Sequence, residues 1–141
     1  MVIGGLAMIV HGSSKLTADV DVMYRRDRDQ ATRIANALGD IHPRLRGFPK
    51  DLPFIWEASS LLNTTLCTLE SDLGDVDLLA EASGSGGYAN LRNNALLTEI
   101  DGIIVPIASL QDLLNMKRAS GRSKDDIHIA ELEDWLTEES V

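Results

Sequence analysis

The stretch Ile3–Tyr24, IGGLAMIVHGSSKLTADVDVMY, organises the rest of the chain. It predicts the end of a strand, a double glycine, a short helix, a polar loop and a second strand. In that second strand Asp19 and Asp21 stand two residues apart, so both side chains leave the same face, with Cα atoms about 6.5 Å apart. Val20 and Val22 leave the opposite face and are expected in the core. The pattern therefore predicts a half-buried strand that carries two carboxylates on its open face.

This stretch combines two features that suit phosphate chemistry. Two carboxylates so placed can bridge a pair of divalent cations about 3.5–4 Å apart, the separation used for displacement at phosphorus. Upstream, Gly4 and Gly5 open a helix, and the N-terminus of a helix without side chains in the way can bind an anion through its backbone N–H groups. A phosphate site beside a metal-binding strand is therefore predicted.

The same residues carry a resemblance to a known family. The motifs are Gly4-Gly5-Leu6-Ala7, His11-Gly12 and Lys15-x-Thr17-x-Asp19-Val20-Asp21. Together they resemble the signature of the DNA polymerase beta-type nucleotidyltransferase superfamily. Within it, they most resemble the small bacterial nucleotidyltransferases of the AbiEii toxin type. The resemblance spans residues 2–132. It implies an α/β (α+β) chain with the minimal nucleotidyltransferase fold, a mixed β-sheet with helices packed mainly on one face.

The resemblance also implies a third carboxylate on a strand next to the first pair. Asp75-Val76-Asp77-Leu78-Leu79 reads as that strand, with Asp75 and Asp77 on one face. Asp77 is the predicted ligand because it lies inside the strand, whereas Asp75 lies against the Leu73-Gly74 turn. The predicted catalytic and metal-binding set is thus Asp19, Asp21 and Asp77. Such hard oxygen ligands suit two Mg²⁺ ions, with Mn²⁺ as an alternative.

A second group of residues is expected to bind the phosphates of a nucleotide: Gly4, Gly5, Ser13, Ser14, Lys15 and Lys117. Many superfamily members have a serine at the position of Gly5, so Ser13 or Ser14 is expected to supply the missing hydroxyl. Lys117 continues the apolar stripe of a predicted helix, where an unpaired ammonium group is costly. Either its end reaches water, as lysines commonly do, or it meets an anion, and the resemblance favours a triphosphate.

Local signals predict most of the remaining elements. Capping residues and apolar spacing predict helices over 27–38 and after Ser109 and Ser123, the last running from Lys124 to about Leu136. Strands are expected over 64–69, 75–79, 97–100 and 103–107, with a hairpin turn at Asp101-Gly102. The three prolines between 41 and 53 exclude a long regular element there. The glycine-rich segment 82–88 is expected to be a mobile connection at the edge of the cleft, with a nucleotide-facing role as the less favoured alternative.

Composition limits the possible functions. The 141 residues form one expected domain, and 44% of them are hydrophobic. A net charge of −9 argues against a broad nucleic-acid-binding surface. Twelve of the 13 Lys and Arg residues lie in 15–50 or 117–124, which could leave a local positive rim on an acidic protein. With a single cysteine, Cys67, and no membrane segment or signal sequence, a cytoplasmic location without membrane partners is expected.

Other kinds of site find little support. His11 lies at the end of the short helix and is expected to cap it, stabilised by the helix dipole. Contact with a nucleotide is the alternative. His42 and His128 lie far apart in the sequence and show no zinc-binding spacing. There is no Gly-x-Ser-x-Gly nucleophile motif, and the aromatic residues are too few and scattered to form a platform for stacking bases.

The resemblance implies transfer of a nucleoside monophosphate from an NTP to a hydroxyl group. The expected acceptor is a tRNA 3′ end or a protein, and the expected biological role is a toxin with a cognate antitoxin. Two alternatives stay open. One is nucleotidylation of an aminoglycoside-type antibiotic, which suits the ten Asp and Glu residues against one Arg in 51–112. The other is a non-catalytic nucleotide-binding module. Family members usually have a helix before the first strand. The domain 1–141 is therefore expected to be truncated at its start and to lack this helix.

Overall fold

The computed structural model describes residues 1–141 and contains one seven-stranded sheet with the strand order β3-β4-β5-β2-β1-β7-β6. The strands are β1 (Val2–Ile3), β2 (Asp19–Met23), β3 (Arg44–Leu45), β4 (Leu66–Glu70), β5 (Asp75–Leu79), β6 (Leu96–Ile100) and β7 (Ile103–Ile107). Two pairs, β2 with β5 and β1 with β7, are parallel, and the other four pairs are antiparallel. The predicted α/β class with a mixed sheet is confirmed.

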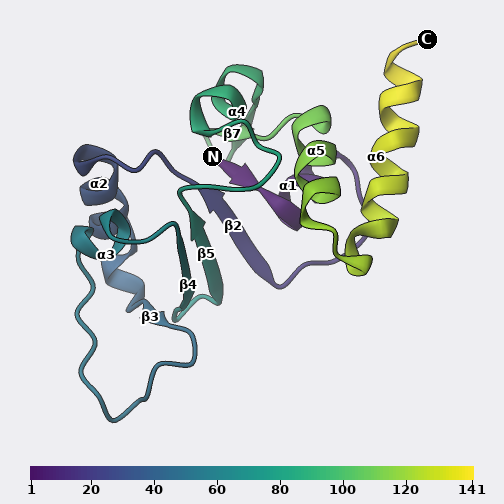
Figure 1. The fold of residues 1–141 in the computed structure, drawn as a ribbon. Helices are drawn as coiled ribbons and strands as arrows, with labels where there is room; N and C mark the ends of the chain where they lie inside the picture. Colours follow the sequence, from purple (N-terminus) through teal and green to yellow (C-terminus); the bar gives the residue numbers. More distant parts are fainter.

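Six α-helices accompany the sheet: α1 (Gly4–His11), α2 (Arg28–Leu38), α3 (Ala58–Leu62), α4 (Tyr88–Asn94), α5 (Leu110–Ser120) and α6 (Asp126–Glu139). Four of them, α1, α4, α5 and α6, contribute to one apolar cluster, in line with the expectation that most helices share one side. The helices α2 and α3 pack with a second cluster on the opposite side of the sheet, as Figure 1 shows. No helix is long and apolar enough to cross a membrane.

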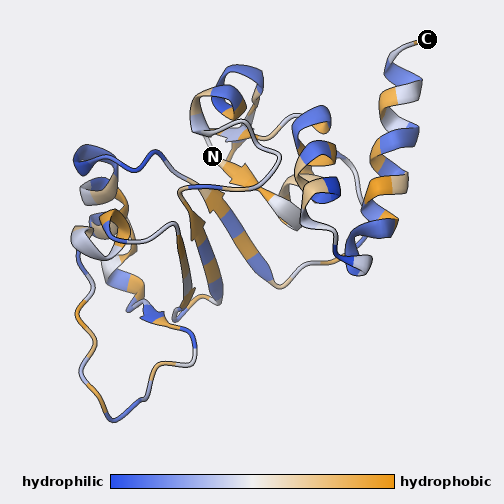
Figure 2. Cartoon of the chain, viewed as in Figure 1, coloured by the Kyte–Doolittle hydropathy of each residue, from blue (hydrophilic) through white to orange (hydrophobic).

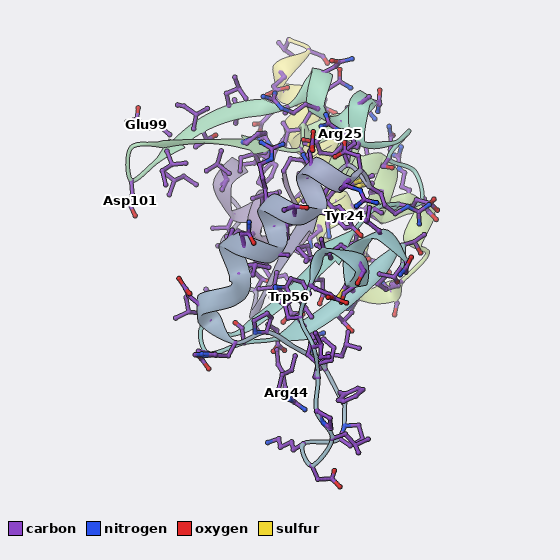
Figure 3. The ribbon with its side chains drawn as sticks, turned by 90° about the vertical axis from the view of Figure 1, so that its left-hand side faces the viewer. Tyr24, Arg25, Arg44, Trp56, Glu99 and Asp101 are labelled. Atoms are coloured by element: carbon purple, nitrogen blue, oxygen red, sulfur yellow. The ribbon has the colours of Figure 1, made fainter.

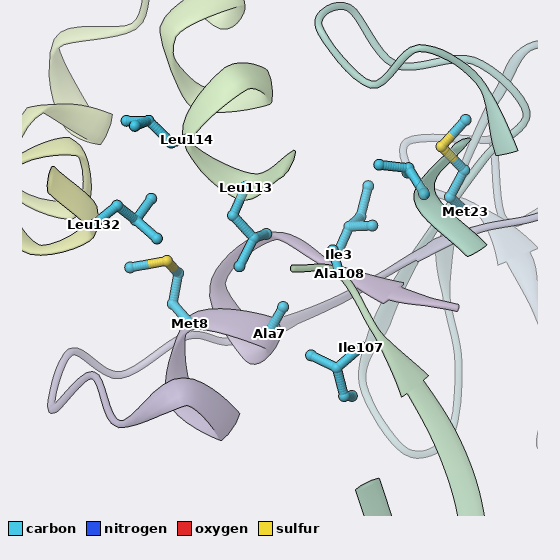
Figure 4. Packing of buried hydrophobic residues seen from close by; sticks show 10 residues of the cluster. Ile3, Ala7, Met8, Met23, Ile107, Ala108, Leu113, Leu114 and Leu132 are labelled. Carbon is cyan, nitrogen blue, oxygen red and sulfur yellow. The ribbon is translucent and has the colours of Figure 1, made fainter. Parts of the chain in front are cut away.

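The first apolar cluster fixes the position of α1 and α5 beside the central strands. Figure 4 shows Ala7 and Met8 of α1 next to Leu113 of α5 and Ile107 of β7, all of them buried. Met23 at the end of β2 joins the same cluster. Because side chains alternate along a strand, Asp21 leaves β2 on the same face as Met23. The cluster therefore holds α1 and α5 on the carboxylate-bearing face of the sheet.

The opposite face of the central strands is covered by α2 and α3. Val22 packs there as predicted, beside the buried side chains of Tyr24 and Leu78. Val20, which was expected in the core, is 37% exposed instead. It lines an apolar groove beside Ile34 of α2, and α2 does not cover this end of β2 completely. The alternation of apolar and acidic residues along β2 is visible in Figure 2.

Local signals account for several element boundaries. The Asp27 carboxylate accepts a 2.8 Å hydrogen bond from the Gln30 amide and begins α2, and the Ser109 hydroxyl accepts one from the Asp112 amide at 3.1 Å and begins α5. Asp101 and Gly102 both have positive φ, as the predicted two-residue hairpin turn requires. That hairpin extends away from the body of the protein, with Asp101 at its tip, as does the loop after β3 near Arg44 (Figure 3).

The local structure differs from the sequence-based predictions in several places. The helix expected from Lys124 is preceded by a 3-10 turn over Ser123–Asp125, and no side chain caps it. The short strand β3 and the helix α4 were not predicted. The glycine-rich segment is not a free connection: Ser85 is 2% exposed, and a side chain at Gly84 would overlap the Asn115 carbonyl of α5. Close packing of the backbone on α5 and a positive φ of +79° both favour glycine at position 84.

Candidate functional site

The parallel pairing of β2 with β5 brings the acidic residues of the two strands together. Asp21 lies opposite Asp77, and Asp19 lies opposite Asp75. Since the pairing is in register and the residues are two apart, all four side chains leave one face of the sheet. The predicted third ligand, Asp77, is thus the direct neighbour of Asp21. Asp75, which the sequence analysis did not choose as a ligand, lies on the same face beside Asp19.

The Asp21 carboxyl group is in an environment that disfavours its negative charge. Its burial, the charges of Asp77 and Asp19, and a hydrogen bond shared with Asp77 raise the pKa of Asp21 from 3.8 to about 6. The charge of Lys117 partly opposes this shift in pKa. The negative charges of neighbouring carboxylates repel the charged form of Asp21, and a bound cation would offset this repulsion.

The donor atoms therefore suit a hard divalent cation. Asp19, Asp21 and Asp77 offer only carboxylate oxygens, the ligands that Mg²⁺ and Mn²⁺ prefer. The structure brings Asp21 and Asp77 into contact, while no group of three acidic, histidine or cysteine side chains is close enough to form a complete metal site. Asp19 is the remaining carboxylate at the same end of β2, and its charge acts on Asp21.

Arg46 also contacts this carboxylate group, although no sequence pattern pointed to it. Its guanidinium donates to Asp77 Oδ1 at 2.8 Å and lies 3.3 Å from Asp75 Oδ2. Arg46 follows β3, whose pairing with β4 carries it to this face. It is held there by two backbone-directed bonds, from its amide to the Thr68 carbonyl and from its guanidinium to the Leu69 carbonyl. Arg46 therefore provides positive charge beside Asp77, the predicted third ligand.

The double glycine lies directly against the acidic strand. Gly4 has φ +65°, and any side chain there would overlap Asp21 Oδ2. At Gly5 an added Cβ would lie 2.9 Å from the Thr17 hydroxyl oxygen. Thr17, and not Ser13 or Ser14, thus places a hydroxyl at the position next to Gly5. Both glycines allow the start of α1 to approach the carboxylates and the loop that precedes β2.

Three more residues that were predicted to bind phosphate, Ser13, Ser14 and Lys15, lie in different environments. Ser13 is buried, and its hydroxyl donates to the Glu131 carboxylate of α6 at 3.0 Å. Ser14 is exposed. Neither lines the space beside Asp21, so the structure gives them no contact with the predicted site. Lys15 does line that space, and its ammonium group donates to the Lys124 carbonyl at 3.3 Å.

Lys117 does not extend into water. It is 7% exposed, and its ammonium group forms a 3.2 Å ion pair with Asp125. Burial alone would raise the pKa of Asp125, but hydrogen bonds from Ser120 and Lys117 and the nearby charges of Lys117 and Arg122 outweigh it and lower the pKa. Asp125 thus holds Lys117 in place, and the charge of Lys117 still acts on Asp21. Of the two alternatives expected for Lys117, extension into water is therefore excluded, and the anion that its ammonium group contacts in this structure is the Asp125 carboxylate.

Two adjoining cavities meet at these residues. We call the first the charged cavity; it is lined by the three predicted metal ligands and by Lys15, Lys117, Arg122, Lys124 and His128. The second, the mixed cavity, has a volume of about 390 Å³ and includes the apolar side chains of Ile3, Leu66, Leu79, Leu113 and Met116. Gly4, Asp21, Asp77, Lys117 and Arg122 belong to both cavities. A cavity of that size is within the range that accommodates small organic ligands.

His128 was not among the site residues predicted from the sequence, yet it lines the charged cavity. The sequence did contain a signal for it. Asp125 and His128 precede Ile129 and Leu132 at helical spacing, so they continue the buried stripe of α6 toward its first turn. His11, in contrast, bonds through Nε2 to the Ala108 carbonyl at 2.8 Å and does not line either cavity.

Comparison with known proteins adds no family assignment: no protein-family model and no curated protein matches the chain.

Proposed function

We propose that this protein is a metal-dependent nucleotidyltransferase that uses an NTP as donor. The observation that carries the proposal is the in-register contact of Asp21 and Asp77 on parallel strands, beside the glycine-flanked start of α1. The raised pKa of Asp21 supports it, because catalytic and metal-binding carboxylates are commonly the groups with perturbed pKa values. The resemblance of Ile3–Tyr24 to nucleotidyltransferases of the AbiEii type points to the same chemistry.

Positive and negative groups in the charged cavity have complementary tasks in this reaction. Asp19, Asp21 and Asp77 would hold Mg²⁺, which supplies charge neutralisation at the phosphates and a lower pKa for an acceptor hydroxyl. Lys117, Lys15 and Arg122 line the same cavity and would oppose the negative charge of the triphosphate. Gly4 and Gly5 leave room for a phosphate group close to the first amides of α1.

The buried ion pair of Lys117 contributes orientation. Asp125 fixes the lysine with help from Ser120, at 2.8 Å, and from Arg122, at 3.0 Å. A cation held in this way loses little further freedom when a phosphate binds, and catalysis of phosphoryl-group transfer rests mainly on such positioning. The adjoining mixed cavity offers apolar surface for the base or sugar of the nucleotide, or for part of the acceptor.

The acceptor and the biological role are further parts of the proposal. Resemblance to the AbiEii type supports a tRNA 3′ end or a protein hydroxyl as the acceptor, with a toxin role and a cognate antitoxin. The net charge of −9 is compatible with an acidic surface that contacts RNA only around the charged cavity, where basic side chains gather.

The test is transfer of label from NTPs. The protein is incubated with each [α-³²P]NTP and Mg²⁺, and separately with total RNA, cell protein or an aminoglycoside. Label on RNA or protein supports the proposal as stated, and label on the antibiotic redirects it to drug modification. Retention of label in free NTP with every acceptor, in the presence of Mg²⁺ or Mn²⁺, would instead indicate a non-catalytic module.

A further inference from the structure

His128 in the first turn of α6 has no hydrogen-bond partner. The side chain is 7% exposed, and both ring nitrogens are buried without a donor or acceptor in contact. The other two histidines differ: His11 bonds to the Ala108 carbonyl, and His42 bonds to the Asp72 carboxylate at 2.5 Å. Leaving buried polar atoms unpaired is costly, so the unpaired ring of His128 calls for an explanation.

Charged groups from several elements face this ring. Lys117 comes from α5, Lys15 from the loop between α1 and β2, Asp125 from the turn before α6, and Glu131 from α6 itself. Burial and the charges of Lys117 and Lys15 lower the pKa of His128, while Glu131 and Asp125 oppose that change in pKa. The ring is therefore mainly neutral at pH 7, with one N–H donor and one acceptor nitrogen.

The carboxylates near His128 already have partners. Asp125 accepts bonds from Lys117, Ser120 and Arg122, and Glu131 accepts from Ser13. The cavity that His128 lines is also bounded by basic side chains, among them Lys15, Lys117 and Lys124. An anion in this cavity would thus meet several positive groups, the first turn of a 14-residue helix and an available imidazole N–H.

We infer that His128 binds a phosphate group of the nucleotide, donating its ring N–H to a phosphate oxygen in the charged cavity. The inference rests on the proposed function and assigns His128 to the triphosphate. Lys15 is exposed, and its ammonium group is held only by the Lys124 carbonyl at 3.3 Å. Its side chain can therefore move to let the phosphate reach the ring and can then contact the same phosphate.

The experiment uses the imidazole signals of the full chain in long-range ¹H–¹⁵N NMR spectra. Only three histidines are present, so single His→Gln variants assign every signal. Tripolyphosphate, ATP and orthophosphate are titrated at constant ionic strength and pH. We expect tripolyphosphate and ATP to shift the His128 signals in a saturable manner, while the signals of His11 and His42 stay within a small fraction of that change. A response to orthophosphate equal to that with ATP would indicate a general phosphate site, which overturns the assignment to the triphosphate.

Affinity measurements with matched variants give a second readout. His128→Phe keeps an aromatic ring and removes the hydrogen bond, and His128→Gln restores a donor. We expect His128→Phe to weaken ATP binding at least about tenfold, the usual effect of losing a hydrogen bond to a charged group, with partial recovery in His128→Gln. The control His42→Phe, at an exposed site, should bind as the original protein does. Saturation with ATP without any change at His128 overturns the inference, and so does absence of binding by every phosphate compound.

These results are separable from a failure of the proposed function. Phosphate binding at His128 without nucleotidyl transfer to any acceptor would reject the enzyme and keep the site. Transfer activity with a KM for NTP that is unchanged in His128→Phe would keep the enzyme and reject the role of His128.

Discussion

Asp21 on β2 and Asp77 on β5 are register partners in a parallel strand pair, and the charge of Asp77 helps to raise the pKa of Asp21 although 56 residues separate the two in the sequence. Such a contact between like-charged groups is unfavourable unless a proton or a cation lies between them. Arg46, which directly follows β3, donates to Asp77 and relieves part of the repulsion. The pair is therefore an electrostatically unfavourable contact within the sheet and the centre of the proposed site.

Manganese binding should report on this pair directly. Mn²⁺ broadens NMR signals of nearby nuclei, so we expect the backbone amides of Asp21 and Asp77 to broaden at the lowest Mn²⁺ concentrations. Asp21→Asn removes one charged ligand and should weaken the effect by about tenfold or more. The amide of Asp101 at the hairpin tip is the reference, since a lone exposed carboxylate is a poor site. Equal broadening at Asp101 and Asp21 would contradict a specific site.

The stability of the protein without divalent cations should depend on Asp21 in a particular pH window. Its pKa in the folded state, about 6, is above the unfolded value of 3.8, so the folded state binds the proton more tightly. The corresponding stabilisation is fully present below about pH 4 and is lost as the pH rises through 6. Asp21→Asn should therefore raise the free energy of unfolding at pH 7.5 by roughly 1–2 kcal/mol, after allowance for solvent screening.

The measurement is urea unfolding of both proteins in EDTA at pH 7.5 and pH 4. The difference in unfolding free energy should shrink toward zero at the lower pH. Asp75→Asn is the matched control on the same face of β5, and its more exposed carboxylate should give a difference within about 0.5 kcal/mol. A destabilised Asp21→Asn at pH 7.5 would show that the carboxylate is not under electrostatic strain.

The two glycines before α1 should respond differently to substitution. Gly4→Ala places a Cβ onto Asp21 Oδ2 in a backbone conformation that L-residues rarely adopt, so we expect a loss of about 2 kcal/mol or more and displaced carboxylates. Gly5→Ala has an ordinary helical position and meets only the exposed Thr17 side chain. It should cost less than about 1 kcal/mol. Thermal unfolding ranks the two variants, and equal effects would contradict the close approach at Gly4.

The ion pair of Lys117 and Asp125 can be tested by removing each partner. Asp125→Ala leaves a buried ammonium group without its carboxylate and should cost about 3–5 kcal/mol. Adding Lys117→Met to that variant removes the unpaired charge and should recover part of the loss. Denaturant unfolding of the single and double variants provides the cycle. Additive losses would mean that the two side chains do not interact.

The parts of the fold that were predictable are those set by short-range patterns. The alternation in Asp19–Met23 and in Asp75–Leu79 gave both acidic strands, and Asp101-Gly102 gave the outer hairpin with its turn. Each depends on side-chain alternation or backbone conformation over a few residues. The side of β5 on which Asp77 lies followed from the same alternation, and its pairing with Asp21 came from the resemblance.

The parts that were missed depend on contacts between distant segments. Ser13 looked available for phosphate, but Glu131, 118 residues later, accepts its hydroxyl hydrogen bond. Arg46 reaches Asp77 only because the short strand β3 pairs with β4. His128 could have been found from its place on the buried stripe of α6, as Lys117 was on α5. Its neighbours Lys15 and Lys117, however, come from other elements that the local sequence does not locate.

The central claim is that Asp77, paired with Asp21, holds the metal ion that the proposed nucleotidyl transfer needs, and one comparison tests it most directly. Label transfer from [α-³²P]NTP with Mg²⁺ is measured for the original protein, Asp77→Asn and Asp75→Asn, after circular dichroism has shown that all three are folded. We predict at least about a thousandfold loss of rate for Asp77→Asn, because a metal-binding carboxylate is removed, and less than about tenfold for Asp75→Asn. Unchanged transfer by Asp77→Asn, or equal losses in the two variants, would contradict the account.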